Sequence, residues 1–376
     1  MTKLGVGIIG CGNISNTYLR LAPLFKGLEM RAVADIDPET ASNRAAAYSV
    51  AARSIDDLLA SSDIDVVVNL TIPEAHFEVT KSILEAGKHA YSEKPIVLTL
   101  EDGETLRGLA AEKGLRVGSA PDTFLGGSHQ LARRAIDDGA VGRITGGTAH
   151  VMNHGMEHWH PNPDFFFRPG AGPMLDIGPY YVTNLIQLLG PVARVGALTN
   201  SAYKERTITS EPRSGETVPV ETPTNIHALL EFVSGACVTL TTSWDVHAHR
   251  HGHMELYGTE GSLFLPDPNF FGGTVEQGAP GGAITALDPW PHPFGVSNEA
   301  EDDRANYRAS GLADMATAIA EGRAHRCSLD LALHAVDVMT AALTSGESGQ
   351  FVTLSTTCER PAPLSPEEAR ALLAAT

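Results

Sequence analysis

The chain has 376 residues, 43% of them hydrophobic and 19% charged, so we expect a folded protein with a sizeable core and two domains rather than one. Its formal net charge of −18 argues against binding to the phosphate backbone of a nucleic acid. We find no run of ~18 uninterrupted apolar residues, so no membrane-spanning helix is expected.

Short apolar runs alternate with helical patterns over the first third of the chain. This alternation is typical of a parallel sheet covered by helices on both faces. The expected strands are residues 4–10, 29–37, 64–70, 88–93 and 115–120, and the expected helices are residues 14–25, 38–48, 75–87 and 100–114.

The pattern of expected elements changes after about residue 121. Strands there follow one another with tight turns, which is typical of an antiparallel sheet. We therefore predict an α/β domain with a doubly wound parallel sheet at 1–122, and an α+β domain with a large, mainly antiparallel sheet at 123–376. The expected strands are 143–152, 225–232, 236–244, 253–258 and 262–265, the expected helices are 128–138, 174–190, 312–321 and 329–345, and long loops are expected at 153–168 and 265–283.

The stretch "GIIGCGNIS" follows the first strand and opens the first helix. Gly10, Gly12 and Ser15 stand on the G-x-G-x-x-G template, in which glycines permit a tight turn and the close approach of a pyrophosphate. A helix that begins with Asn13 and Ile14 would offer backbone N–H groups to this anion. The pattern predicts a dinucleotide site.

Asp35 ends the second strand at about the expected distance beyond the glycines. A carboxylate there accepts hydrogen bonds from both ribose hydroxyls of NAD and repels the 2′-phosphate of NADP, so NAD is the expected cofactor. The alternative is that Asp35 only caps the strand end. Asp37, directly before Pro38, is expected to be the N-cap of the next helix.

Four motifs together resemble one known family. "GIIGCGNIS", "ADID", "SEKP" and "GPMLDIGPYY" are similar to motifs of the glucose–fructose oxidoreductase, inositol dehydrogenase and MocA group, known as Gfo/Idh/MocA. The resemblance covers nearly the whole chain, including "YGTEGSL" and "SLDLALHAVDVM". It implies a Rossmann domain that binds NAD, and a second domain for substrate binding and for assembly of a homodimer or homotetramer through its sheet.

Lys94 lies between Glu93 and Pro95 where the expected strand 88–93 ends, and this edge of an open α/β sheet faces the cofactor crevice. The resemblance implies that Lys94 hydrogen-bonds the substrate oxygen that is oxidised or reduced, where an ammonium stabilises developing negative charge. Glu93 would orient Lys94 or cap nearby backbone, and Pro95 would fix the turn through a cis bond. The alternative is a surface salt bridge at a strand end.

Asp176 and Tyr180 are four residues apart, a spacing that places both on one face of a helix. The resemblance implies that they belong to the catalytic site, where Tyr180 would take the hydroxyl proton and Asp176 would position the substrate or Lys94. Proton loss from Lys94 itself is the alternative. Tyr181 is expected to serve packing only.

Two more motif positions follow from the resemblance. In "NLTIPEAHFEV", Thr71 and His76 match a stretch near the cofactor in the family, while Ile72 and Pro73 depart from it. His76 serving only as a helix cap is the alternative.

The expected substrate residues lie in two loops. Asn153, His158 and Trp159 follow a long strand and combine planar hydrogen-bonding groups with an aromatic platform, as a sugar-like ligand requires. Asp122, after the expected strand 115–120, stands where many sugar-acting relatives carry a basic residue nearby. An oligomer contact or a plain loop is the alternative for the first stretch.

Two histidine-rich stretches raise the question of a metal site. Residues 154–160 and 247–253 carry seven histidines, but no carboxylate or cysteine stands at a standard ligand spacing, so no metal is expected. The cysteines also lack metal-site or disulfide spacing, which predicts free thiols in a reducing cytoplasm. They are Cys11, Cys237, Cys327 and Cys358.

We therefore expect an NAD-dependent oxidoreductase that transfers a hydride between nicotinamide and a secondary alcohol or carbonyl of a sugar, sugar derivative or cyclitol. One alternative is an NAD-dependent glycosidase with a transient oxidation step. Another is a catalytically inactive nucleotide-sensing regulator.

Overall fold

The chain forms two units, each assembled from separate stretches of sequence. The computed structural model describes residues 3–299 and 304–374. One unit contains Met1–Gly127, Pro291–Leu333 and Pro361–Thr376, and the other contains Ser128–Trp290 and His334–Arg360. The expected division into 1–122 and 123–376 differs from these units, because two late stretches pack with the N-terminal residues. As a division into cofactor and substrate domains it stays a prediction.

The first unit contains a six-stranded sheet in the order β3-β2-β1-β4-β5-β6, and all neighbouring strands pair in parallel. This is the doubly wound arrangement expected from the alternating pattern. The strands are β1 (Leu4–Ile9), β2 (Leu28–Ala34), β3 (Ala51–Ala52), β4 (Val66–Asn69), β5 (His89–Ser92) and β6 (Val117–Ser119).

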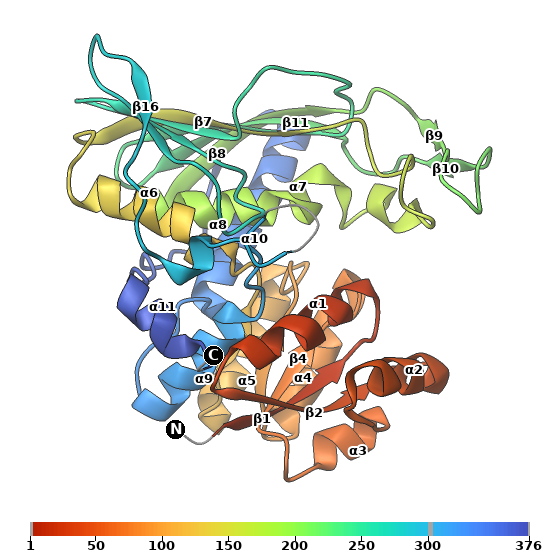
Figure 1. The fold of residues 1–376 in the computed structure, drawn as a ribbon. Helices are drawn as coiled ribbons and strands as arrows, with labels where there is room; N and C mark the ends of the chain where they lie inside the picture. The colour runs from red at the N-terminus through yellow and green to blue at the C-terminus, as the bar shows by residue number, and fades with distance from the viewer. Residues whose placement is uncertain (1–2, 300–303, 375–376) are drawn as a thin grey trace. The chain divides into compact units, whose positions relative to one another are not determined.

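Helices of this unit join the strands and flank the sheet (Figure 1). All four residues of β4 are buried, and three of them are valines, as is typical of a strand covered on both faces. The helices are α1 (Asn13–Leu21), α2 (Pro38–Tyr48), α3 (Ile55–Ala60), α4 (His76–Glu85), α5 (Leu100–Lys113), α9 (Ser310–Glu321) and α11 (Pro366–Leu372).

The second unit contains a nine-stranded sheet in the order β16-β15-β14-β13-β7-β12-β11-β8-β17. β7 and β12 run parallel, and the other neighbours pair antiparallel, so the expected mainly antiparallel sheet is confirmed. The strands are β7 (Ile144–Met152), β8 (Val192–Asn200), β11 (Asn225–Phe232), β12 (Cys237–Ser243), β13 (Met254–Gly258), β14 (Ser262–Leu265), β15 (Glu276–Gly278), β16 (Ile284–Ala286) and β17 (Val352–Thr353).

This sheet has a covered face and an open face. Helices α6 (Gly127–Asp137), α7 (Gly172–Asp176) and α8 (Gly178–Leu189) lie along one side of it in Figure 1, and α10 (Leu329–Ser348) carries the chain from the first unit into the second. In β11 the alternate residues Ile226 and Leu230 are buried, whereas His227 and Leu229 are exposed. The period of two follows from the pleat of the strand.

Two expectations for this unit were wrong. Residues 174–190 do not form one helix, because α7 ends at Asp176 and α8 begins at Gly178. Pro179 lies in the first turn of α8 and has no N–H to donate, so it cannot continue the hydrogen bonds of α7 across Ile177. The loop at 265–283 is also not free of strands, because it contains β15.

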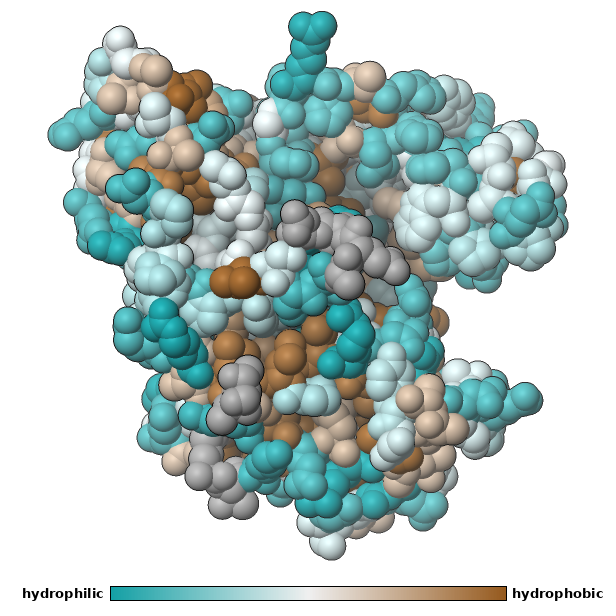
Figure 2. Space-filling view, in the orientation of Figure 1, coloured by the Kyte–Doolittle hydropathy of each residue, from teal (hydrophilic) through white to brown (hydrophobic). Residues whose placement is uncertain are grey.

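Among the described residues, no helix combines the length and the apolar character needed to cross a bilayer. Figure 2 shows mostly hydrophilic side chains on the visible face, as expected for a chain with a net charge of −18.

Candidate active site

The glycine loop between β1 and α1 depends on its two glycines in different ways. Gly10 has a φ of +99°, and a Cβ there would lie 2.6 Å from the carbonyl carbon and oxygen of Leu70, so only glycine fits. A Cβ on Gly12 would meet no atom within 4 Å. The space in front of Gly12 is therefore left open by the protein.

The start of α1 offers backbone donors to this open space. Gly12 is the N-cap of α1 and provides no side-chain cap, so the first N–H groups of the helix stay available for an anion. Ser15, which replaces the third glycine of the template, is fully buried, and its hydroxyl donates to the Gly12 carbonyl at 2.6 Å. Ser15 thus adds a hydrogen bond within the loop.

Asp35 follows the last residue of β2 and is fixed by main-chain donors. One carboxylate oxygen accepts from the Cys11 N–H at 2.7 Å, and the other accepts from the Asp37 N–H at 3.0 Å. Each oxygen of a carboxylate has capacity for a second donor, so ribose hydroxyls remain acceptable. Asp37 is the N-cap of α2, as expected, and accepts from the N–H groups of Glu39 and Thr40.

A cavity of about 700 Å³ lies beside Asp35. Its lining includes Ile36, Arg53 and Asp56, so it offers an exposed apolar side chain together with carboxylates. The guanidinium of Arg53 is bound to both carboxylate oxygens of Asp63, at 2.8 and 2.9 Å. Arg53 is therefore already neutralised and is poorly placed to attract a 2′-phosphate.

Thr71 and His76 belong to the loop after β4. The Thr71 hydroxyl donates to Asn69 at 2.7 Å. The His76 ring is 1% exposed, with Nδ1 2.6 Å from the Pro95 carbonyl oxygen and Nε2 3.1 Å from that of Thr71. Burial lowers the pKa of His76, so the neutral ring donates to one carbonyl. His76 links the loops after β4 and β5, and its role at the cofactor stays a prediction.

Lys94 lies just beyond β5, in a turn that neighbouring side chains hold in place. Glu93 accepts from the Lys94 main-chain N–H at 3.1 Å and, with its other oxygen, from the Tyr18 hydroxyl at 3.1 Å. The Glu93 N–H donates to the Asn69 carbonyl at 2.9 Å, and the Lys94–Pro95 peptide bond is cis. The expectation that Glu93 caps nearby backbone is confirmed. The sequence analysis missed Tyr18 and Asn69, because their partners lie 75 and 24 residues away along the chain.

Asp122 is only 2% exposed and holds the start of α9. Its carboxylate accepts from the Gly311 N–H at 3.0 Å and from the Ser310 hydroxyl at 3.2 Å. Burial raises the pKa of Asp122 to about 6. These contacts give Asp122 a structural role in the first unit, and the expected contact with a substrate stays a prediction.

Asp176 and Tyr180 belong to the second unit, on either side of the break between α7 and α8. Asp176 ends α7, and Tyr180 lies in the first turn of α8. The argument that one continuous helix presents both side chains on one face therefore fails, and their joint role stays a prediction. Tyr181 is 1% exposed, and its hydroxyl lies 3.1 Å from His253 Nδ1 and 3.3 Å from Asp267, in agreement with the expected packing role.

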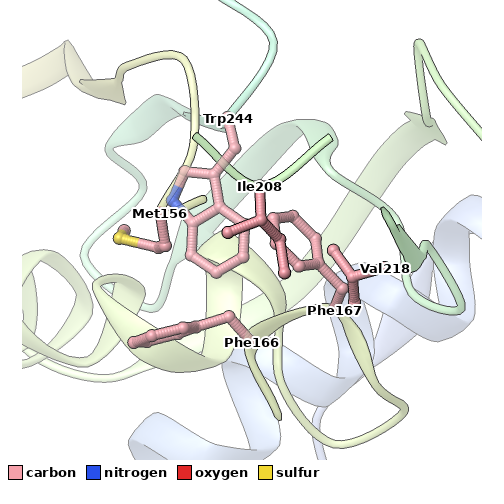
Figure 3. Close-up of a cluster of buried hydrophobic side chains, with 6 residues drawn as sticks. All are labelled: Met156, Phe166, Phe167, Ile208, Val218 and Trp244. Carbon is pink, nitrogen blue, oxygen red and sulfur yellow. The ribbon is translucent and has the colours of Figure 1, made fainter. Parts of the chain in front are cut away.

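The loop at 153–168 packs against an arm formed by β9 (Glu205–Thr207) and β10 (Thr217–Pro219), two strands that the sequence analysis did not predict. Figure 3 shows the buried cluster between them, in which apolar side chains surround the indole of Trp244. The cluster contains Met156, Phe166, Phe167, Ile208, Val218 and Trp244. It makes the loop and the arm one folded substructure.

A buried arginine joins the same two segments. Arg206 is 6% exposed and pairs with Glu157 at 2.8 Å and with Asp245. Its guanidinium lies 5.2 Å from the centre of the Tyr203 ring and 5.5 Å from that of Phe167, both within the range of cation–π contacts. Arg206 was not predicted, because its hydrogen-bond partners lie 38 to 52 residues away along the chain.

A cavity of about 360 Å³ opens beside Arg206. His154 and His158 stack at a ring distance of 4.0 Å, and His247 lies 5.6 Å from His154; all three line the cavity. The other two expected substrate residues of this loop, Asn153 and Trp159, do not line the cavity. Trp159 is 57% exposed, and Asn153 accepts from the Gly155 N–H at 2.9 Å. The cavity combines ring faces, carboxylates and a guanidinium.

Within residues 3–299 and 304–374, no group of three or more histidine, cysteine, aspartate or glutamate side chains is arranged to hold a metal ion. The histidines instead stack on one another, as His150 and His251 also do at 4.2 Å.

A doubly wound sheet with an open glycine loop, an acidic residue after β2 and a lysine beyond β5 defines a dinucleotide-binding protein of the oxidoreductase type. The family model described as "Oxidoreductase family, NAD-binding Rossmann fold" matches residues 4–120, and the GFO/IDH/MocA C-terminal domain matches residues 129–264. The chain therefore belongs to the Gfo/Idh/MocA family of NAD-binding oxidoreductases.

Relatives and solved structures agree with this membership. The chain is 26% identical to levoglucosan dehydrogenase of Pseudarthrobacter phenanthrenivorans, over 70% of this chain and 73% of that protein. It is 29% identical to inositol 2-dehydrogenase of Rhizobium meliloti, over 37% of this chain and 42% of that protein. A levoglucosan dehydrogenase in complex with NADH and L-sorbose has the same fold, with a TM-score of 0.81 and 21% identity over 95% of this chain and all of the other.

Proposed function

We propose that this oxidoreductase transfers a hydride between NAD and a secondary alcohol or carbonyl of a sugar, sugar derivative or cyclitol. The observation that carries the proposal is the placement of Lys94 just beyond β5, in the same sheet as an open glycine loop and Asp35. In open α/β sheets this edge is where the ligand binds. The names of the relatives, levoglucosan dehydrogenase and inositol 2-dehydrogenase, support a polyhydroxylated substrate.

When bound, NAD accepts or supplies the hydride. The protein's own residues handle the proton and the charge on the substrate oxygen. Lys94 donates a hydrogen bond to that oxygen and stabilises the negative charge that develops on it. Tyr180 takes the hydroxyl proton during oxidation and returns it during reduction. Asp176 holds the substrate or Lys94 in position.

NAD is the proposed cofactor rather than NADP. Asp35 repels a phosphate on the adenosine ribose, and its two main-chain hydrogen bonds keep the carboxylate in place. The cavity beside it is also lined by Asp56 and Asp57, whereas the charge of Arg53 is neutralised by Asp63. We assign Gly10, Gly12, Asn13, Ile14, Asp35, Thr71, His76, Glu93 and Lys94 to the cofactor.

Substrate recognition is proposed for the loop at 153–168. The cavity beside Arg206 offers carboxylate acceptors and stacked imidazole faces, a combination that suits a polyhydroxylated ring. His158 lines this cavity, and Asn153 and Trp159 flank it along the chain. Asp122 is the fourth proposed substrate residue, although its described contacts are with α9.

A homodimer or homotetramer is proposed to form through the open face of the nine-stranded sheet. Leu198, Leu229 and Phe351 are 75%, 52% and 56% exposed there, and they line a shallow cavity of about 350 Å³. Apolar side chains gathered on one face are typical of an association surface.

We further propose a cytoplasmic location, since none of the four cysteines forms a disulfide.

Assay of the purified protein with NAD against a panel of polyols and pyranosides tests the function. We expect net formation of NADH with at least one of these substrates. Cleavage of a pyranoside without net NADH would indicate the NAD-dependent glycosidase instead. Binding of NAD without turnover of any substrate would indicate a regulator.

A further inference from the structure

Arg44, on α2, reaches the glycine loop from the side. Its Nη2 donates to the carbonyl oxygen of Cys11 at 3.1 Å and lies 3.3 Å from that of Gly12. Its Nε is buried and has no hydrogen-bond partner among the described residues. Neither the glycine template nor the acidic residue after β2 accounts for this arginine.

The two carbonyl groups that Arg44 contacts determine where two N–H groups point. A trans peptide is planar, and its C=O and N–H point in opposite directions. Because Arg44 binds the Cys11 and Gly12 carbonyls, the N–H groups of Gly12 and Asn13 point away from it. In the described part of the chain, no group accepts a hydrogen bond from either N–H. These are donors of the type that bind an anion at a helix N-terminus.

The loop needs such a restraint because of its composition. Glycine has more backbone freedom to lose than any other residue, and Gly10 and Gly12 flank Cys11. Asp35 fixes the Cys11 N–H, and Ser15 donates to the Gly12 carbonyl, but the Cys11 carbonyl is held by Arg44. Ordering these peptides before the ligand arrives lowers the cost of binding.

We propose that Arg44 is a positioning residue for the pyrophosphate of the cofactor, which acts by orienting the Cys11–Gly12 and Gly12–Asn13 peptides. The inference rests on the proposed use of NAD. In this role Arg44 makes no contact with the adenosine ribose. The role therefore differs from that of a residue that binds the 2′-phosphate of NADP.

Calorimetric titration of the full chain with NAD, NADP, ADP-ribose and adenosine tests the proposal. Arg44→Met removes the charge and the donors. We expect the affinity for NAD and ADP-ribose to fall by ~10–100-fold, the range that loss of a charged hydrogen bond gives. The affinity for adenosine, which has no phosphate, should stay within about twofold, because the proposed role of Arg44 concerns only the pyrophosphate. Arg31→Met, on β2 and away from the loop, is the matched control and should leave all four affinities unchanged.

Two further variants distinguish an effect of Arg44 on the orientation of the loop peptides from an effect of its charge on the pyrophosphate. Arg44→Gln keeps a donor without charge, and Arg44→Lys keeps a charged donor; both should retain more affinity for ADP-ribose than Arg44→Met. If Arg44→Gln loses as much as Arg44→Met while Arg44→Lys matches the wild type, charge alone acts and the proposal is wrong.

Three other results would also overturn the proposal. They are loss confined to NADP, equal loss for adenosine and ADP-ribose, and no loss in Arg44→Met. A lower melting temperature with unchanged ligand affinities would show a purely structural role. If the wild type binds neither NAD nor ADP-ribose, the proposed function itself fails, and this result is distinct from all the others.

Discussion

Among single residues, we propose that the charge of Asp35 next to the glycine loop determines the preference for NAD over NADP. The Asp35 carboxylate is held by two main-chain N–H groups, so it cannot easily turn away from an approaching phosphate. We expect NAD to bind at least about tenfold more tightly than NADP, about 1.4 kcal/mol. Titration with both nucleotides measures this ratio. Asp35→Ser should narrow the gap, and equal affinities in the wild type would contradict the assignment.

Tyr180 is proposed to take the hydroxyl proton of the substrate, and substitution of this residue tests that role. Tyr180→Phe removes only the hydroxyl, so turnover should fall by roughly 10²–10⁴, the usual contribution of general acid–base catalysis. The Michaelis constant should change little, because the interaction is made mainly in the transition state. Steady-state kinetics separate the two constants. If the Michaelis constant rises while turnover is intact, Tyr180 only binds substrate, and Lys94 becomes the better candidate for the base.

Among the elements, the start of α9 donates hydrogen bonds to Asp122, and this buried carboxyl group should make the stability of the protein depend on pH. Burial raises the pKa of Asp122 to about 6, above the value near 3.9 of an unfolded chain. Between these values the folded state keeps a proton that the unfolded state has lost. The stabilisation is therefore fully present below pH ~4 and is lost as the pH rises through about 6.

Asp122→Asn removes this titration and keeps an acceptor for Gly311 and Ser310. The free energy of unfolding of the wild type, measured relative to the variant, should fall by about 2 kcal/mol between pH 4.5 and pH 7. Denaturant unfolding at several pH values gives this difference. A difference that does not depend on pH would mean that Asp122 titrates normally.

Elements with a strong local pattern could be predicted from the sequence. Five of the six strands of the parallel sheet were predicted, because each of these short runs ends at a recognisable turn or helix start; Asp37 and Pro38 mark the start of α2, for example. The two-residue strand β3 was not predicted. The arm of β9 and β10 has no such pattern, since each strand has only three residues. Its formation depends on Trp244 and Phe167, which lie far from it in sequence. Local reasoning cannot find such contacts.

The same limit applies to the candidate site. Gly10, Gly12 and Asp35 could be predicted because the template fixes their spacing, and the structure gives them the expected surroundings. Tyr18 and Arg44 could not, because each acts on a residue brought close only by the fold. The break at Ile177 was missed because the apolar pattern continues across it, although Gly178 and Pro179 marked its place.

At the scale of the whole molecule, the open face of the large sheet predicts assembly. Leu229 is 52% exposed on β11, opposite Gly196 of β8 and Thr239 of β12, and it lines the shallow cavity together with Leu198 and Phe351. A charge buried in an interface without a partner is costly, so Leu229→Glu should shift the protein from an oligomer to a monomer. Light scattering after size-exclusion chromatography measures this. A wild type that is already monomeric would contradict the proposed interface.

Lys94 is proposed to stabilise charge on a substrate oxygen during hydride transfer. The most direct test is a single-turnover measurement of NADH formation by the wild type and Lys94→Met, with the best alcohol from the substrate panel. The substitution removes the cation and roughly keeps the volume. We expect the rate to fall by roughly 10²–10⁴, while the affinity for NAD, measured by titration, is unchanged. An unchanged rate, or a loss explained entirely by weaker NAD binding, would contradict this account.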